Sequence, residues 1–386
     1  MVDRSLLHRL LARLPAGLRR ALKSVPGASR LRDRVYGLPH GKTPPEGSLR
    51  PIVYLPTWLR WDAMKQRPQY LLEAFARAGH EVWFVDPRVA QEEHREPGIR
   101  LVGSLGPTPR SDVILYTHFA PTRTLVELYE NPAVVYDILD DLSIYDPAEK
   151  GVPDSLRVRS HHGPLAGDAD VVITSSAVLE EKHHAERNDI LLVENGVDLE
   201  LFSPGAASQP ADSPVVGYHG AIAPWFDFAL VDQLARARPA YGIRLVGPVR
   251  PEVSEAMERL LTLANVIHVG EQPTGSIVES VRSFDVGLIP FLVDEMTAGV
   301  SPLKLYEYLA CLVPVVSTPL PASVDHPAVS VATNPGEFAA LVDIALEMGP
   351  EERAALRGHA ETASWDQRIA PLLERLDSLG LRLVSS

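Results

Sequence analysis

Two series of short apolar runs, each alternating with helical segments, limit the folds open to this 386-residue chain more than any other feature. The first series lies at residues 52–56, 81–86, 112–117, 133–138, 171–175 and 190–195. The second lies at residues 215–220, 243–248, 266–270, 286–291, 314–318 and 329–333. Strands that alternate with helices pair in parallel and carry helices on both faces of their sheet. The pattern therefore predicts an α/β protein with two doubly wound halves in series.

Composition marks the boundaries of these halves. Residues 37–50 are rich in Pro and Gly, and a small, proline-rich stretch follows Pro204, so both read as linkers. We predict an N-terminal arm and linker at 1–50, Rossmann-like domains at 51–203 and 215–363, a linker at 204–214, and a bridging C-terminal helix at 364–386. Such sheets bind ligands beyond the carboxyl ends of their strands, so the two domains should face each other across one cleft.

Charge is unevenly distributed along the chain. Residues 1–36 hold nine Arg or Lys and two Asp, a net charge of +7. Since the whole chain has a net charge of −13, the remainder carries −20. The acidic body argues against nucleic-acid binding, whereas the arm has the pattern of a basic amphipathic helix that could contact an anionic membrane surface. A helix packed on the protein body, or a frayed tail, is an equal alternative for the arm.

The cellular setting is inferred from what the sequence lacks. Cys311 is the only cysteine, which excludes an intramolecular disulfide and favours a reducing, cytosolic location. No apolar run has the length of a membrane span, and charged residues interrupt the N-terminal segment, so we expect a protein that is not exported. A peripheral position on the inner face of the cell membrane is compatible with the basic arm.

The stretch SPLKLYEYLACLVPVVSTP, residues 301–319, carries the clearest candidate binding site. Ser301 reads as an N-cap, and Lys304 would lie one turn into the helix. A helix N-terminus with an adjacent lysine suits a phosphate group. Glu307 lies on the same helix face and could accept hydrogen bonds from neighbouring hydroxyls, a combination that suits a sugar nucleotide. A plain helix start with a surface ion pair is the alternative.

Polar residues also follow the predicted strands of the first half. Asp140, Asp141 and His118 stand at carboxyl ends that should face the cleft, where one of them could deprotonate an acceptor. The loop after the first strand supplies basic residues, which could meet an anionic acceptor, and aromatic ones, which could stack on a sugar; solvation and packing are the alternatives. These loop residues are Trp58, Arg60, Trp61, Lys65 and Arg67.

No metal site is expected. Asp168 and Asp170 form an Asp-x-Asp pair, but the pair precedes a strand instead of ending one, which favours a solvated turn. The pairs at 161–162 and 183–184 are histidines without a third ligand at metal-binding spacing.

Several ordered segments resemble glycosyltransferases of the two-Rossmann GT-B fold, of the kind grouped in glycosyltransferase family 4. The sequence is most similar to the bacterial cell-envelope branch that includes the teichuronic acid biosynthesis enzymes. The segments are WDAMKQRPQYLLEAFARAGHEVWFVDP, VYDILDD, ENGVDLELFSP, GYHGAIAPWFDFALVDQLARARP and SPLKLYEYLACLVPVVSTP, and the resemblance covers residues 51–380.

The resemblance implies a transfer reaction and assigns donor residues. It implies that Ser301, Lys304 and the backbone of Gly220 hold the diphosphate of a UDP or GDP type donor, that Glu307 holds the ribose, and that the loop Gly270, Glu271 and Gln272 holds the base. No further cofactor and no metal are implied.

The chain departs from the family pattern at two places. Gly299 stands where many relatives carry a glutamate eight residues before Glu307, and the loop from Gly220 to Asp227 lacks the basic residues that many relatives use on the diphosphate. Lys304 would then carry more of the phosphate binding.

The function implied is glycosyl transfer from a nucleotide sugar to a hydroxyl of a glycan or lipid-linked acceptor, in cell-envelope polysaccharide biosynthesis. Both retaining and inverting courses stay open. A sugar-nucleotide epimerase of the same fold and a catalytically degenerate donor-binding member are the alternatives.

Overall fold

The computed structural model describes residues 44–57, 59–62, 64–142, 157–205 and 213–384. The predicted amphipathic arm and Trp58 lie outside this part of the chain. Within it, no helix is long and apolar enough to cross a membrane. The strands form two separate sheets, one in each half of the sequence, and all twelve predicted strands are present, most of them shortened at one or both ends.

The first sheet has the strand order β3-β4-β2-β1-β5-β6-β7-β8, and all neighbours are parallel except the edge pair β3 and β4. Its strands are β1 (Ile52–Tyr54), β2 (Val82–Val85), β3 (Glu93–Arg95), β4 (Ile99–Val102), β5 (Ile114–Thr117), β6 (Ala133–Ile138), β7 (Val171–Thr174) and β8 (Leu191–Leu192). The central strands are buried along their whole length, as continuous apolar runs predict. Strands β3 and β4 are additions to the prediction, because β3 is short and charged and the apolar run of β4 is interrupted by Arg100.

The second sheet is entirely parallel, with the order β11-β10-β9-β12-β13-β14. Its strands are β9 (Val215–His219), β10 (Gly242–Val246), β11 (Val266–Gly270), β12 (Val286–Ile289), β13 (Val315–Ser317) and β14 (Val329–Val331). In chain order this is 3-2-1-4-5-6, the Rossmann arrangement, whose switch point lies between β9 and β12. The first sheet has its own switch point between β1 and β5.

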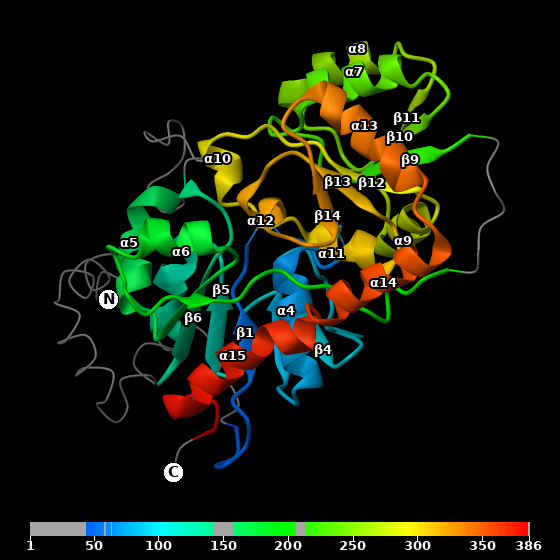
Figure 1. Cartoon of the computed structure of the whole chain (residues 1–386). Helices are drawn as coiled ribbons and strands as arrows, with labels where there is room; N and C mark the ends of the chain where they lie inside the picture. The colour runs from blue at the N-terminus through cyan, green and yellow to red at the C-terminus, as the bar shows by residue number, and fades with distance from the viewer. Residues whose placement is uncertain (1–43, 58, 63, 143–156, 206–212, 385–386) are drawn as a thin grey trace.

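Helices cover the sheets and close the interface between them (Figure 1). In the first half they are α4 (Arg67–Arg77), the 3₁₀ segment η1 (Ala120–Leu128), α5 (Val158–Asp168) and α6 (Ala177–His183). In the second they are α7 (Phe228–Ala237), η4 (Pro251–Val253), α8 (Ser254–Leu260), α9 (Thr274–Arg282), α10 (Glu295–Ala298), α11 (Leu303–Ala310), α12 (Pro321–Val324), α13 (Pro335–Leu346), α14 (Pro350–Glu361) and α15 (Trp365–Ser378).

Helix α4 shows how the sequence sets these elements. Its apolar residues follow helical periodicity, and Gly79 follows the helix end with a φ of +94°, a conformation that glycine adopts readily. The last helix, α15, packs against α4, and the ring of Trp365 stacks on Tyr70 at 5.3 Å. The C-terminal segment thus returns to the first sheet, as Figure 1 shows for the red helix beside α4.

Candidate functional site

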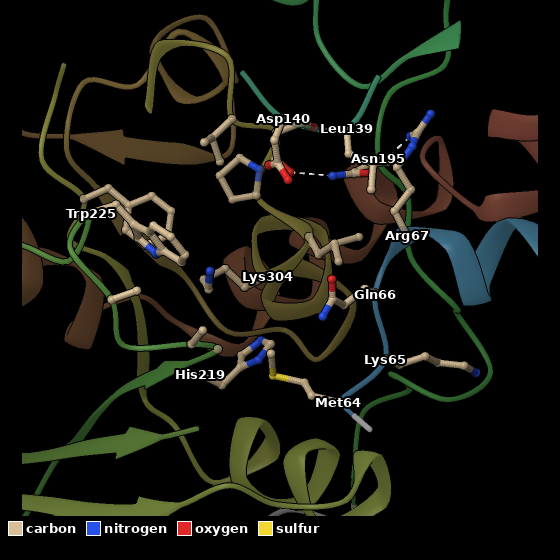
Figure 2. A pocket seen from close by; sticks show the side chains of 18 of the residues that line it. Met64, Lys65, Gln66, Arg67, Leu139, Asp140, Asn195, His219, Trp225 and Lys304 are labelled. Carbon is tan, nitrogen blue, oxygen red and sulfur yellow. Dashed lines mark hydrogen bonds between the residues drawn. The ribbon is translucent and has the colours of Figure 1, made fainter. Parts of the chain in front are cut away.

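A cavity of about 560 Å³ lies between the two sheets, beyond the carboxyl ends of β1, β6, β9 and β12. Residues 64–68, 70, 139–141, 195 and 202 line it from the first half. Residues 218–221, 223–225, 250, 252, 274, 277, 291, 296, 297, 300–304 and 307 line it from the second. Both switch points contribute, which is where open parallel sheets bind ligands. In Figure 2, Trp225, Lys304 and His219 lie toward one side of this cavity and Arg67 and Asn195 toward the other.

Helix α11 presents its first turn and Lys304 to the cavity. The Lys304 ammonium lies 4.6 Å from the ring centre of Phe291 and 5.0 Å from that of Tyr218, and it makes no hydrogen bond to any residue that the structure describes. Desolvation lowers the pKa of Lys304 to about 8, and the opposing attraction of Glu307 is weaker. The side chain is therefore a cation at neutral pH whose donor hydrogens are uncommitted.

The structure corrects the N-cap predicted at Ser301 and places Gly220 beside Lys304. Ser301 is not the N-cap: the cap is Pro302, whose backbone is extended with a ψ of 115°. The Ser301 carbonyl instead accepts a hydrogen bond from Nδ2 of Asn195 at 2.5 Å, a contact between the two halves. Gly220 has a φ of +124°, and a β-carbon there would lie 3.3 Å from Nζ of Lys304. Glycine therefore keeps this loop close to the lysine.

Glu307 is buried at the back of the cavity, so the surface ion pair considered for it is excluded. Its Oε1 accepts a hydrogen bond from the Tyr70 hydroxyl at 3.3 Å, and its Oε2 lies 3.0 Å from Nε2 of His219. The Tyr70 bond therefore joins α4 of the first half to α11 of the second, while His219 of β9 lies beside the carboxylate without a hydrogen bond to it. The Glu307 side chain retains lone pairs for a ligand hydroxyl, because a carboxylate accepts about four hydrogen bonds.

Among the candidate bases, Asp140 and Asp141 line the cavity but in different states. Asp141 is buried and accepts a hydrogen bond from Nζ of Lys182 at 2.6 Å. Asp140 is exposed to the cavity, where desolvation, followed by the charges of Asp137 and Asp141, raises its pKa to about 6. Asp140 is thus ionised at neutral pH with a pKa near that suited to a general base.

His118 is not among the cavity-lining residues. Its Nδ1 lies 2.9 Å from the Tyr54 hydroxyl, and its ring stacks on that of Tyr54 at 5.9 Å. Burial lowers the pKa of His118 to about 4, which makes the imidazole a weak base. The structure therefore favours Asp140 over His118 as the proton acceptor.

Two of the basic residues after β1, Arg67 and Lys65, are paired within the protein and are not solvated. Arg67 is the first residue of α4 and is buried; Nε donates to both Asp137 oxygens, at 2.9 and 3.2 Å, and Nη1 donates to Asn195 at 3.1 Å. Lys65 pairs with Glu73 at 2.6 Å. Both line the cavity, but their charges are largely neutralised.

Arg60 and Trp61 do not line the cavity. Arg60 is exposed, and the Trp61 ring packs edge-on against Phe84 at 5.3 Å. The alternatives of solvation and packing describe these two residues better than acceptor binding does.

The segment proposed for the base, Gly270 to Gln272, also lies outside the cavity lining. Gly270 has a φ of +83°, and its carbonyl accepts a hydrogen bond from the Gly247 amide at 2.8 Å. Glu271 is exposed, and Gln272 donates to the Val269 carbonyl at 3.2 Å. Thr274 and Ile277 of the following helix do line the cavity, so the loop stands at its rim.

Gly299 is a contact between the halves. A β-carbon at this position would lie 2.9 Å from Cδ2 of Leu179, and the Gly299 carbonyl accepts a hydrogen bond from the Ser176 hydroxyl at 2.8 Å. A glutamate side chain would need the space that the start of α6 occupies. Nearby Glu295 is instead bonded to Lys182 at 3.2 Å.

Sequence reasoning missed several cavity residues. His219 is the last residue of β9 and Asn195 lies three residues after β8, so their place at the carboxyl ends of apolar strands is the available signal for them. Arg250 and Trp225 stand in loops of the second half; Arg250 is exposed at the cavity and adds a cation that the loop after Gly220 lacks. Only their place after a strand of the second sheet could have indicated them.

The expectation that the paired histidines lack a third ligand is wrong. His162 and His183 meet, and Glu186 joins them, with the candidate ligand atoms within 4.8 Å of one another. The set was missed because His162 lies 21 residues before His183 and the two rings meet only in the fold. Glu186 lies three residues after His183.

Two Rossmann-like sheets that face one cavity at their switch points define the GT-B fold, and this chain has it. Solved structures agree. Sucrose-phosphate synthase from Thermosynechococcus elongatus matches 86% of this chain and 99% of its own with a TM-score of 0.64 at 16% identity. Anabaena Alr3699/HepE, solved in complex with UDP and glucose, matches 85% of this chain and all of its own with a TM-score of 0.61 at 14% identity.

Among curated proteins the chain is similar to TuaH of Bacillus subtilis (strain 168), whose assigned function is that of a teichuronic acid biosynthesis glycosyltransferase. The two are 29% identical over 222 residues, 54% of this chain and 56% of TuaH. The chain spans about half the length of the curated relatives it matches. No family model matches it. The resemblance drawn from the sequence motifs is confirmed by these similarities.

Proposed function

We propose that this chain is a glycosyltransferase that moves a sugar from a nucleoside diphosphate donor to a hydroxyl of a glycan or lipid-linked acceptor, in the synthesis of a cell-envelope polysaccharide. The observation that carries the proposal is the uncommitted Lys304 cation at the start of α11, facing a cavity formed by both sheets. The likeness to TuaH and the UDP and glucose in the HepE structure support this choice.

The donor diphosphate would bind at Lys304, the first turn of α11 and Gly220. Helix N-termini and lysine both favour phosphate, and charge developing on the leaving diphosphate would be stabilised there in a partly desolvated site. Exposed Arg250 would add a second charge. Glu307 would hold the ribose hydroxyls, and the Gly270–Gln272 loop the UDP or GDP base.

The acceptor would approach from the first sheet, where Asp140 is the exposed carboxylate. In an inverting course Asp140 would accept the proton of the attacking hydroxyl; in a retaining course the leaving phosphate could accept it. Nη2 of Arg67 has no hydrogen-bond partner among the described residues, but the atom is buried and the guanidinium is paired with Asp137, so the acceptor contact in this proposal rests on Asp140.

A panel of nucleotide sugars tests the proposal. The native protein should be stabilised against heat by one donor class, because a ligand that binds only the folded state raises the melting temperature. That donor should then be consumed only when a glycan or lipid-linked acceptor is added. A change in the sugar of the free nucleotide without acceptor would identify an epimerase, and binding without turnover would identify a degenerate member.

Replacement of Asp140 separates the two courses. If Asp140 is the general base, Asp140→Asn should lower the turnover number about 10²–10⁴-fold with little change in donor affinity. Product stereochemistry, read by NMR, should then show inversion. A retained anomer with near-normal turnover in the variant would assign the proton to the leaving phosphate instead.

Residues 1–36 could place the enzyme on an anionic membrane near a lipid-linked acceptor. Full-length protein should sediment with anionic vesicles, and a chain lacking residues 1–40 should not. Equal sedimentation of both would remove this role.

A further inference from the structure

Two buried histidines and a glutamate meet on the first half of the molecule, apart from the cavity. Nε2 of His162, in α5, lies 3.2 Å from Nδ1 of His183, the last residue of α6. Oε2 of Glu186 lies 2.8 Å from the first nitrogen and 3.3 Å from the second. None of the three lines the cavity described above, and no step proposed for glycosyl transfer uses them.

The three atoms have the spacing of metal ligands. Tetrahedral zinc at bond lengths of about 2.0–2.2 Å separates its ligand atoms by roughly 3.3 Å. The three separations here, 2.8, 3.2 and 3.3 Å, allow one ion to contact all three atoms with small adjustments of the side chains. Two imidazoles and one carboxylate form a donor set that suits zinc, whereas Mg²⁺ and Ca²⁺ prefer oxygen ligands alone.

The surroundings of the cluster orient the ligands. The Tyr136 hydroxyl lies 2.8 Å from Nδ1 of His162, so a proton on Nδ1 would leave the Nε2 lone pair for the ion. Both histidines are at most 3% exposed, next to an apolar cluster that includes Val158 and Leu165. The Glu186 side chain is 45% exposed, which leaves the solvent side open for a water as fourth ligand.

We propose that His162, His183 and Glu186 form a zinc site that fixes α6 against α5. Nε2 of His183 has no hydrogen-bond partner among the described residues, so this ring is held through the contacts of its Nδ1 with His162 and Glu186. The neighbouring Lys182 bonds to Asp141 and to Glu295, on opposite sides of the interface between the halves. An ion at the end of α6 would therefore stabilise the position of Lys182 without contacting the donor or the acceptor.

Metal titration of the full-length protein tests the site. After treatment with a chelator and dialysis, the protein should bind one equivalent of Zn²⁺, and Co²⁺ in its place should give the intense visible absorption of four-coordinate cobalt. Glu186→Gln and His183→Gln should each lower Zn²⁺ affinity at least tenfold and remove the cobalt spectrum. His184→Gln is the matched control, because His184 is adjacent and exposed, and it should behave as wild type.

Thermal unfolding keeps the test independent of variant folding. Zn²⁺ at a hundredfold excess over its dissociation constant should raise the melting temperature of the wild type by a few degrees, and Mg²⁺ should not. Glu186→Gln changes a half-exposed side chain, so it should fold yet lose the shift. Absence of stoichiometric Zn²⁺ binding, or binding that both variants retain, would overturn the proposal while leaving donor binding untouched.

Discussion

The two walls of the cavity carry similar charges but use them differently. On the first-half wall, Arg67, Lys65 and Asp141 are each bonded to a partner within the same half. On the second-half wall, Lys304 has aromatic faces around it and no hydrogen-bond partner among the described residues. These three charges of the first wall therefore stabilise the fold, whereas the second wall keeps the Lys304 charge available for a ligand. This difference explains why the donor side is the easier one to recognise.

Loss of Arg67 should produce the largest effect and should fall on stability. Arg67→Met would leave the fully buried Asp137 with only the Tyr116 hydroxyl, at 2.6 Å, as a strong partner. Removal of one member of a buried ion pair costs about 3–5 kcal/mol, so chemical denaturation should show a loss of that order. Arg60→Met, at an exposed position, is the control and should be neutral.

A double variant sharpens this result. Arg67→Met with Asp137→Leu removes both charges and should recover much of the loss, because no buried charge remains. If Arg67→Met instead keeps wild-type stability and loses acceptor binding, the first wall is a ligand site in the same sense as the second, and the contrast between the walls fails.

Loss of Lys304 should have the opposite profile. Lys304→Met removes a charge-assisted hydrogen bond to phosphate, worth about 1.5–3 kcal/mol, so donor affinity should fall roughly 10- to 100-fold in calorimetric titration. Because desolvation disfavours this cation in the folded state, the variant should be no less stable than wild type. Arg259→Ala, an exposed change on α8, serves as the control. A variant that binds donor normally would contradict the assignment of the second wall.

Much of this contrast was beyond the sequence. The strands were predicted because continuous apolar runs have few other structures in an α/β chain. Asp140 followed from the rule that carboxyl ends of parallel strands meet, Lys304 and Glu307 from the pattern of a helix N-terminus, and Gly220 from the family resemblance. The partner of a charged residue is set by tertiary packing. Asp137 is 70 residues from Arg67, and no local pattern links them.

The same reason explains the other misses. In the sequence, Gly299 is a departure from the glutamate that many relatives carry, but in the fold it is the point where Leu179 of the other half packs. The histidines at 162 and 183 were not recognised as parts of one cluster because 21 residues separate them in the chain, and only the fold brings their ring nitrogens within 3.2 Å. Sequence reasoning therefore locates which loops share a site, and the structure decides which side chains in them remain available.

The titration of Lys304 should also appear in the pH dependence of donor binding, with a smaller effect on affinity than the replacement of this residue. Since its pKa is lowered to about 8, the side chain is a cation below that pH and becomes neutral above it. Donor affinity should be constant near pH 7 and fall by up to about tenfold per unit as the pH rises past 8. Lys304→Arg should bind with a flatter profile, because arginine keeps its charge. A wild-type profile that Lys304→Met shares would assign the titration to another group.

The smallest expected effect concerns the stability cost of Asp140, the one exposed acid on the first wall. Its pKa is raised from 3.8 to about 6, so the folded state binds the proton more tightly than the unfolded chain. The favourable contribution of the protonated form is complete below about pH 4 and is lost as the pH rises through 6. Asp140→Asn should therefore raise the melting temperature slightly at pH 7.5, with a difference that disappears toward pH 4. Since solvent reaches this side chain, the change in melting temperature should be small. A variant less stable than wild type at pH 7.5 would mean that the Asp140 carboxylate, like those of Asp137 and Asp141, supports the fold, and the first wall would then have no acid kept for chemistry.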